Sequence, residues 1–457
     1  MPSTAITPCD NGPYGGGAEA VDSRLMTGPS SSRSLLRHPD FLRLWTAETI
    51  SVFGSSITQL ALPLIAATVL EVSAFEFGLL TTIAFLPFIL LSLPAGVWVD
   101  RLRRRPILIA ADLGRAAAIM SIPVAFAFDA LTIWQLYAVG FVNGCLTVFF
   151  DVAYQSYLPS VVERDQLVDG NAKLEITRSA AQILGPGIAG VLIGILRAPF
   201  AMLLDAVSFA VSALFLGWIR RPEPAPAPHD EGAHGPRRSM RADIASGLRY
   251  VTGHRWLRSI AATTGISNFF GNVLGAILIL YLTQERGLSA AAIGFAFSVG
   301  SLGVFTGALS TGATTRRLGV GRVLVLAAVG FSISGLPVAL APDELIWAGV
   351  ALWGFLGGFS GVAWNINQVS LRQAITPPRM QGRMNATMRF IVWGTIPLGA
   401  ITGGILGDRI GLDRTILVGA VGGLVAFLPV ALSSVRHLVR IPEPVEDAPD
   451  AGVAAPA

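Results

Sequence analysis

The sequence is poor in charged residues. Of its 457 residues, 14% are charged and 52% are hydrophobic, and the mean hydropathy is +0.61. A soluble globular domain has about a quarter of its residues charged. This shortage excludes an ordinary soluble domain and favours a chain that lies mostly in lipid.

Cysteine and histidine are also scarce, and neither is placed for chemistry. Cys9 lies in a polar tail and Cys145 in a hydrophobic run, so they show neither disulfide nor metal-site spacing. The five histidines all fall in expected loops or tails: His38, His229, His234, His254 and His437. We therefore expect no metal site, and histidine cannot carry protons inside the membrane.

Catalytic and nucleotide-binding motifs are missing as well. The chain has no glycine-rich phosphate loop and no Ser/His/Asp set, so we expect no enzyme activity, no cofactor and no ATP-driven step. Its net charge of +4 is carried by arginine, because Lys173 is the single lysine. These arginines fall in loops on one side of the hydrophobic runs, which indicates membrane topology rather than nucleic-acid binding.

Long hydrophobic runs recur along the chain. About 20 apolar residues span a bilayer as a helix, and the alternating ten-residue segments of a membrane β-barrel are absent. We predict an all-α membrane protein with twelve transmembrane helices in two pseudo-symmetric six-helix bundles. The predicted spans are 44–70, 76–99, 107–128, 132–153, 172–196, 199–219, 258–283, 289–313, 322–341, 344–366, 384–407 and 414–435.

The polar segments divide the chain. Residues 1–43 and 437–457 are expected to be disordered cytoplasmic tails, and 220–256 a cytoplasmic linker between bundles at 44–219 and 257–436. Within the linker, Ile244, Leu248 and Val251 have helical spacing. This spacing fits a helix on the membrane surface or an ordinary solvated linker helix about equally.

The two halves resemble each other in sequence. Gly96, Arg101 and Leu102 recur in the same register as Gly312, Arg317 and Leu318. Other pairs also match: Ser73-Ala74 with Ser289-Ala290, Gly78 with Gly294, Asn171-Ala172 with Asn385-Ala386, and Gly185 and Gly190 with Gly399 and Gly404. Duplicated six-span halves are typical of secondary transporters, whose binding site lies at the midplane between them.

The loop after the second span carries a charged motif. It comprises Gly96, Asp100, Arg101, Arg104 and Arg105. The carboxylate can cap a helix, and the arginines can bond carbonyls at helix ends of the opposite half, so the loop could hold the cytoplasmic side shut. The alternative is that the arginines only set topology. In the second copy of the motif Arg316 replaces the acid.

This loop closely resembles the signature of the major facilitator superfamily. Gly185, Pro186 and Gly190, in the fifth span, resemble the motif of its antiporters, although plain helix packing would also explain them. The segments 382–386 and 393–399 look like its twelve-span exporters of macrolides and enterobactin. The resemblance covers roughly residues 35–438. It implies export by proton antiport.

Charged residues inside spans are costly and are functional suspects. Proton coupling needs a titrating group, and we expect Glu175 or Asp151, followed by Glu48 and Asp112. One helical turn separates Asp112 from Arg115 and Glu175 from Arg178, so these charge partners could instead form a structural salt-bridge network. Asp205 is expected to pair with Arg197 near the outer face. Arg389 is a further base inside a span.

The midplane is otherwise neutral. The candidate substrate-binding residues are Gln59, Asn143, Gln182, Asn268, Asn272 and Trp393. Apolar walls with a few hydrogen-bonding groups suit an amphipathic organic molecule. We therefore expect a monomeric, multi-pass cell-membrane transporter whose partners are a small molecule, protons and lipid. The alternatives are an importer or uniporter of a nutrient and a non-transporting membrane sensor.

Overall fold

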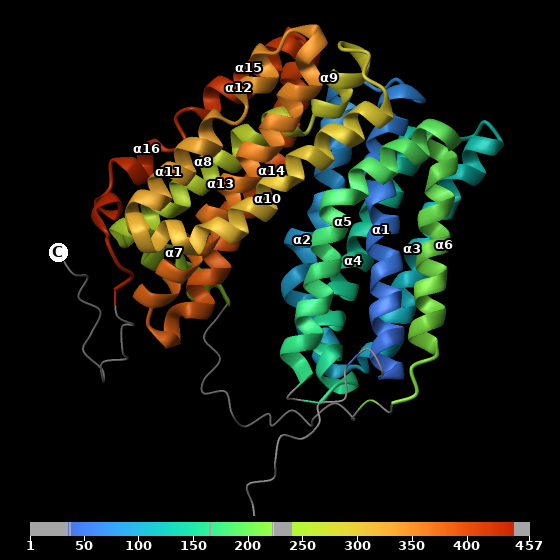
Figure 1. Ribbon diagram of the computed structural model, residues 1–457, viewed down its shortest axis with the longest axis horizontal. Helices are drawn as coiled ribbons and strands as arrows, with labels where there is room; N and C mark the ends of the chain where they lie inside the picture. The colour runs from blue at the N-terminus through green and yellow to red at the C-terminus, as the bar shows by residue number, and fades with distance from the viewer. Residues whose placement is uncertain (1–34, 36–37, 164–165, 222, 224–239, 443–457) are drawn as a thin grey trace, which may run out of the picture.

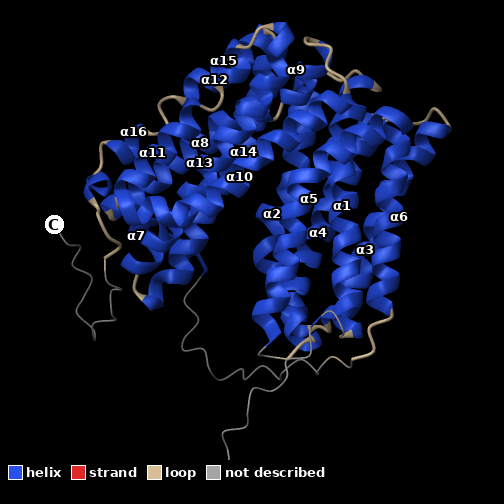
Figure 2. Cartoon of the chain, in the orientation of Figure 1, coloured by secondary structure: helices blue, strands red, loops and turns tan. Residues whose placement is uncertain are grey.

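The computed structural model describes residues 35, 38–163, 166–221, 223 and 240–442. Across these ranges the chain forms helices and no strands (Figures 1 and 2). Twelve helical segments are long and apolar enough to cross a membrane. The predicted all-α fold with twelve spans is therefore confirmed.

The N-terminal bundle consists of six unbroken helices. Proline lies inside several of them, which membrane helices tolerate because neighbouring helices satisfy the freed backbone groups. The helices are α1 (Pro39–Thr68), α2 (Ala74–Arg101), α3 (Arg104–Ala127), α4 (Ile133–Val161), α5 (Leu167–Leu196) and α6 (Ala198–Gly217).

The C-terminal bundle also has six spans, but three of them are built from two helices each. The divided spans are α8 (Arg255–Gly275) with α9 (Leu278–Gln284), α11 (Val320–Ile333) with α12 (Leu336–Leu340), and α15 (Leu412–Gly423) with α16 (Leu428–Ala431). The others are α10 (Ala290–Leu318), α13 (Ile346–Ile375), preceded by the short turn Asp343–Leu345, and α14 (Pro378–Ile410).

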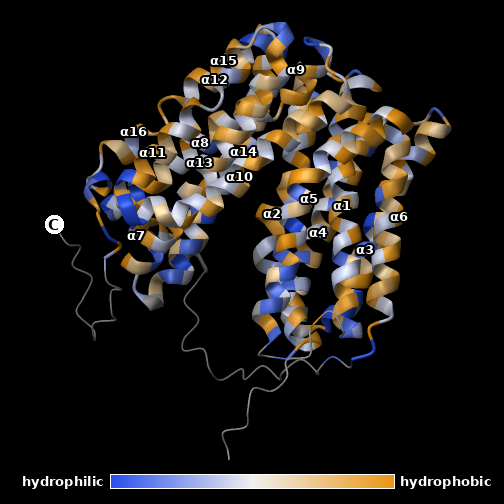
Figure 3. Ribbon diagram, in the orientation of Figure 1, coloured by the Kyte–Doolittle hydropathy of each residue, from blue (hydrophilic) through white to orange (hydrophobic). Residues whose placement is uncertain are grey.

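The two bundles meet at one end and diverge at the other (Figure 1). We call the diverging end, where α6 ends and α7 lies, the linker side, and the end near α9 the far side. The bundles touch where α5 packs on α10, α2 on α14 and α1 on α9. Hydrophilic residues gather near α7 and at the linker-side helix ends, whereas hydrophobic residues run along the helices (Figure 3).

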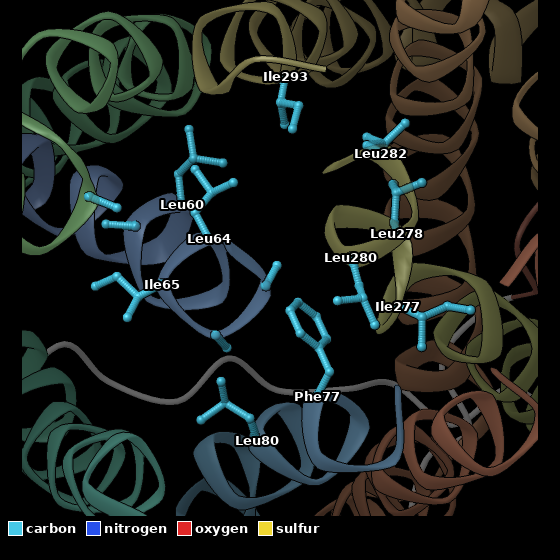
Figure 4. Packing of buried hydrophobic residues seen from close by; sticks show 14 of the residues in the cluster. Leu60, Leu64, Ile65, Phe77, Leu80, Ile277, Leu278, Leu280, Leu282 and Ile293 are labelled. Atoms are coloured by element: carbon cyan, nitrogen blue, oxygen red, sulfur yellow. The ribbon is translucent and has the colours of Figure 1, made fainter. Parts of the chain in front are cut away.

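The buried apolar residues repeat this arrangement. On the far side a single cluster joins both bundles, with Leu64 and Phe77 from one and Leu280 and Ile293 from the other (Figure 4). Toward the linker side each bundle has a separate core of its own. The structure is therefore a two-bundle molecule held together by apolar packing at the far side.

The predicted linker helix is present as α7 (Met240–Gly253) and packs on the C-terminal bundle. Val251 is fully buried in the core of that bundle, and the Tyr250 hydroxyl donates to the Ile375 carbonyl at 3.2 Å. Leu248 is 46% exposed, so the predicted apolar side is only partly buried. The Ile244 side chain lies outside the described residues.

Candidate functional site

Three neighbouring pockets share lining residues, and two of them, the N-wall and central pockets, have residues from both bundles in their walls. The N-wall pocket, about 550 Å³, is lined mainly by α1, α2, α4 and α6. The central pocket, about 570 Å³, shares Asn272 with it and Asn268 with the C-wall pocket. The C-wall pocket, about 490 Å³, is lined by α8, α11, α13 and α14. The three pockets adjoin one another, each is large enough for a drug-sized molecule, and we call them together the cavity.

Five of the six predicted substrate-binding residues line this cavity. Gln59 and Asn143 face the N-wall pocket, and Trp393 faces the C-wall pocket. Asn272 and Asn268 lie between them and are joined by a hydrogen bond of 2.8 Å. The Asn143 Oδ1 atom is buried without a hydrogen-bond partner among the described residues, so it remains available to a ligand.

Gln182 is the sixth predicted residue, and it lines none of the three pockets. It is exposed on α5. The neighbouring motif instead packs α5 against α10 of the other bundle, because a Cβ added to Gly190 would lie 3.1 Å from the Gly294 Cα. The Gly187 N–H also donates to Ser298 Oγ at 2.8 Å. Pro186 and Gly190 of the motif therefore lie at the close contact between the bundles, whereas Gly185 faces Ser56 of α1 in its own bundle.

Arg178 pairs with Glu48 of α1 and not with Glu175. Its guanidinium lies 3.0 Å from Glu48 Oε1. The predicted Glu175–Arg178 pair is wrong because Glu175 points to the exposed surface of α5, whereas the buried Glu48 carboxylate lacks water and needs a cation. Glu175 borders a separate pocket near the linker side, beside Tyr154.

The predicted pair of Asp112 and Arg115 is present and fully buried. Ser212 donates to the other carboxylate oxygen of Asp112 at 2.6 Å. The Arg115 guanidinium lies 4.2 Å from the ring centre of Phe150 and 4.1 Å from that of Phe209. Two rings and one carboxylate therefore hold this cation, in keeping with a structural role as well as a functional one.

Asp205 was predicted to pair with Arg197, and the structure corrects this. Asp205 is fully buried and accepts hydrogen bonds from Thr58 at 2.5 Å and from Ser208 at 3.0 Å, whereas Arg197 is exposed between α5 and α6. Asp205 also lines the N-wall pocket. The sequence signal was Ser208, one helical turn after the acid on the same helix.

Asp151 lies on α4 near both ion pairs and bonds directly to neither. Among the described residues it has no hydrogen bond or salt bridge, although Arg115 and Arg178 act on it electrostatically. Of the carboxylates Glu48, Asp112, Asp151 and Asp205, the first two form ion pairs with arginine, and the last two form none among the described residues.

The charged loop after α2 makes its described contacts with its own bundle and with Glu223 at the start of the linker. The backbone N–H groups of Arg104 and Arg105 donate to the Glu223 carboxylate at 2.7 and 3.2 Å. Arg105 Nε donates to the Leu216 carbonyl at 3.0 Å. The side chains of Asp100 and Arg101 lie outside the described residues, and a Cβ on Gly96 would meet nothing within 4 Å. The predicted bonds from Arg104 and Arg105 to the opposite half are not formed in this conformation.

Two features were missed by sequence reasoning. Asp408, at the far-side end of α14, accepts hydrogen bonds from the backbone N–H groups of Ala74 and Phe75 at the start of α2. Arg389 was predicted as a base inside a span, but its place beside Arg372 in the C-wall pocket was not predicted. Asp408 resembled a loop acid, and only the crossing of α14 with α2 reveals its partner.

The fold and the cavity define a polytopic membrane protein of the two-bundle transporter class. The family model of the Major Facilitator Superfamily matches residues 44–394 and 260–455, and the chain belongs to this family.

Relatives and solved structures agree with this assignment. The chain is 28% identical to the multidrug efflux pump Tap of Mycolicibacterium fortuitum, over 83% of this chain and 92% of Tap. It is 25% identical to the enterobactin exporter EntS of Salmonella typhi, over 88% and 90%. A bacterial homologue of the iron transporter ferroportin, in an inward-facing state, has the same fold, with a TM-score of 0.67, 18% identity and coverage of 88% and 99%.

Proposed function

We propose that this protein exports amphipathic small molecules, such as drugs, antibiotics or secondary metabolites, across the cell membrane by alternating access. The observation that carries the proposal is the cavity between two bundles that share a core on the far side alone. Rocking of one bundle against the other would open the cavity to each side in turn. The similarity to Tap and EntS, both named for export, supports the outward direction.

We place the linker side and both termini in the cytoplasm. The linker-side ends of the helices carry an excess of arginine, including Arg103, Arg104, Arg105, Arg316 and Arg317. Short arginine-rich loops stay on the cytoplasmic side of a membrane. In this orientation the described conformation is inward-facing, ready to receive a substrate from the cytoplasm or the inner leaflet. The protein is proposed to work as a monomer.

Export against a gradient needs an energy source, and we propose protons. Asp205 lines the cavity and has only hydroxyl partners, so it can exchange a proton without breaking an ion pair. Asp151 and Glu175 are the further proposed carriers. Glu48 and Asp112 are less suited, because each would first have to release its arginine.

We also propose that the loop after α2 closes the cytoplasmic side in the outward-facing state. The arginines at its end lie within reach of α6 and Glu223 when that side is open. Substituting Asp100→Asn should then lower flux without lowering the amount of protein in the membrane. Normal flux in this variant would show that the loop only sets topology.

The experiment that tests the function uses inside-out membrane vesicles with an imposed pH gradient, acid inside. Uptake of a panel of fluorescent amphipathic dyes is followed, and vesicles without the protein serve as the control. Uptake that depends on the protein and collapses with the gradient supports proton-coupled export. Uptake that ignores the gradient would indicate a uniporter, and accumulation in intact cells would indicate import.

A further inference from the structure

The C-wall pocket contains two arginines and no acidic residue. Arg372 lies on α13 and Arg389 on α14, and both line this pocket together with Asn268, Trp364 and Trp393. Neither arginine has a carboxylate within 4 Å among the described residues. The C-terminal bundle's described acids lie on its far side: Glu285, Asp343, Glu344, Asp408 and Asp413.

The two guanidinium groups keep unused hydrogen-bonding capacity. Arg372 Nε is buried without a hydrogen-bond partner among the described residues. The Arg389 guanidinium stacks on Trp393, with 5.4 Å between the guanidinium carbon and the ring centre, and makes no ion pair with any described residue. The buried donor of Arg372 is costly without an acceptor, and the positive charge of Arg389, which is itself exposed, repels Arg372. An incoming anion would relieve both penalties.

Membrane topology does not account for Arg389. Topology is set by arginines close to the ends of spans. Arg389 lies nine residues after Met380, the first residue of its candidate span, which at about 1.5 Å per residue is roughly 13 Å along the helix. A charged side chain inside a span is costly and marks a pathway or binding site by default. Arg372, three residues from the end of α13, could serve topology alone, but it shares the pocket with Arg389.

The opposite wall of the cavity contains an acidic residue. Asp205 lines the N-wall pocket, and the one arginine there, Arg115, is held by Asp112 and two aromatic rings. An anionic group would therefore be repelled from the N-wall and attracted to the C-wall. The cavity has a built-in polarity, and it would orient a molecule that is charged at one end.

We propose that the C-wall pocket binds the anionic group, such as a carboxylate or sulfonate, of an amphipathic organic anion. Arg389 and Arg372 hold the charge, and Trp364, Trp393 and Phe331 contact an aromatic or aliphatic body. The proposal rests on the proposed function, since it assigns a class to the transported molecule. It concerns binding, however, and can be measured without transport.

The test uses three probes with one aromatic body and different charge: 2-naphthoate, 2-naphthamide and (2-naphthylmethyl)trimethylammonium. Binding to the full-length protein in nanodiscs is measured by isothermal titration calorimetry, with no gradient applied. Naphthoate should bind at least about tenfold more tightly than naphthamide, because hydrogen bonds to charged groups are stronger than neutral ones. The cation should bind most weakly. High salt should reduce the preference for naphthoate.

Variants test whether the preference for naphthoate comes from the C-wall pocket. Arg389→Gln should remove most of the tenfold difference between naphthoate and naphthamide, Arg372→Gln should reduce that difference, and Arg389→Lys should retain part of it. Arg322→Gln removes an exposed arginine at the linker-side start of α11 and should have no effect.

Two results would overturn the proposal: equal or tighter binding of the cation by the wild type, or an unchanged naphthoate preference in Arg389→Gln. The comparison of the three probes with the wild type can overturn the proposal by itself, even if a variant does not fold. Anion binding without gradient-driven uptake would leave this proposal standing and refute proton-coupled export. Export of dyes without any preference for anionic probes would refute this proposal and leave the proposed export standing.

Discussion

The carboxylate of Asp408, in the C-terminal bundle, caps the first turn of α2 in the N-terminal bundle. Its two oxygens accept from the N–H groups of Ala74 at 2.8 Å and Phe75 at 3.2 Å. An acid at a helix N-terminus satisfies unpaired donors and interacts favourably with the helix dipole. Because Asp408 and α2 belong to different bundles, these two hydrogen bonds must break when the far side opens.

Asp408→Asn is therefore expected to favour the conformation that is open on the far side. Losing the charge weakens the cap by about 1–2 kcal/mol, which corresponds to roughly a 5- to 30-fold shift in the equilibrium. Distances between spin labels at Thr132→Cys and Glu344→Cys, one in each bundle on the far side, report the opening. Asp413→Asn is the control, because Asp413 bonds to Arg286 of its own bundle. Identical distance distributions in Asp408→Asn and the wild type would show that the Asp408 cap does not hold the far side closed.

The contact between α5 and α10 predicts that Gly190→Val stops transport. The added side chain would meet the backbone of α10 near Ala291 and Gly294, both about 3.1 Å from the new Cβ. Overpacking of this kind costs about 1–3 kcal/mol, so the far side should close poorly and flux should fall to less than about a tenth. Gly194→Val on the same helix is the matched control, because nothing lies within 4 Å of its Cβ. Equal loss of flux in both variants would point to a general effect of valine on α5.

Asp205→Asn is expected to uncouple transport from the proton gradient. The amide oxygen can still accept from Thr58, so the fold should survive, but the side chain no longer titrates. Gradient-driven dye uptake should be lost, while exchange of dye down its own gradient continues. Asp151→Asn and Glu175→Gln are measured in parallel. Asp169→Asn, which affects an exposed ion pair with Lys173, is the control. Retained coupling in Asp205→Asn together with loss in one of the other two would transfer the role to that residue.

His254 gives the protein a pH-dependent helix start. Its Nδ1 accepts from the backbone N–H of Trp256 at 3.3 Å at the beginning of α8, and burial, together with Arg255, lowers the pKa of His254 below its ordinary value. The unfolded chain then binds the proton more readily than the folded one. The stability contribution is therefore complete above about pH 6.5 and is lost as the pH falls through the lowered pKa.

Thermal unfolding in nanodiscs between pH 8 and pH 5 checks this. His254→Asn keeps a capping side chain without a titrating group. The free energy of unfolding of His254→Asn should fall less on acidification than that of the wild type. The difference should be about 1 kcal/mol, the usual contribution of a cap. Parallel pH curves for the two proteins would show that His254 does not titrate in this range.

The helices could be predicted from the sequence because hydropathy alone decides where a chain can cross a membrane. The partners of the buried charges could not. Glu175 and Arg178 have ideal helical spacing, yet Glu48, 130 positions away, binds the arginine because it is the carboxylate that the fold removes from water. Asp205 likewise bonds Thr58 across α1 and α6. Spacing along one helix predicts neighbours on its surface, whereas burial between helices selects the partner.

The divided spans of the C-terminal bundle line part of the cavity with backbone atoms, which a side-chain substitution does not replace. At the end of α8 and between α11 and α12, the residues Gly275, Ala276, Ser334 and Gly335 border the central pocket. Irregular backbone at membrane depth is tolerated where it lines a cavity, and it places peptide groups there. Part of the recognition surface would therefore consist of main-chain atoms shared by every variant. Side-chain substitutions in α8 and α11 should accordingly alter the range of accepted molecules while the peptide contacts persist.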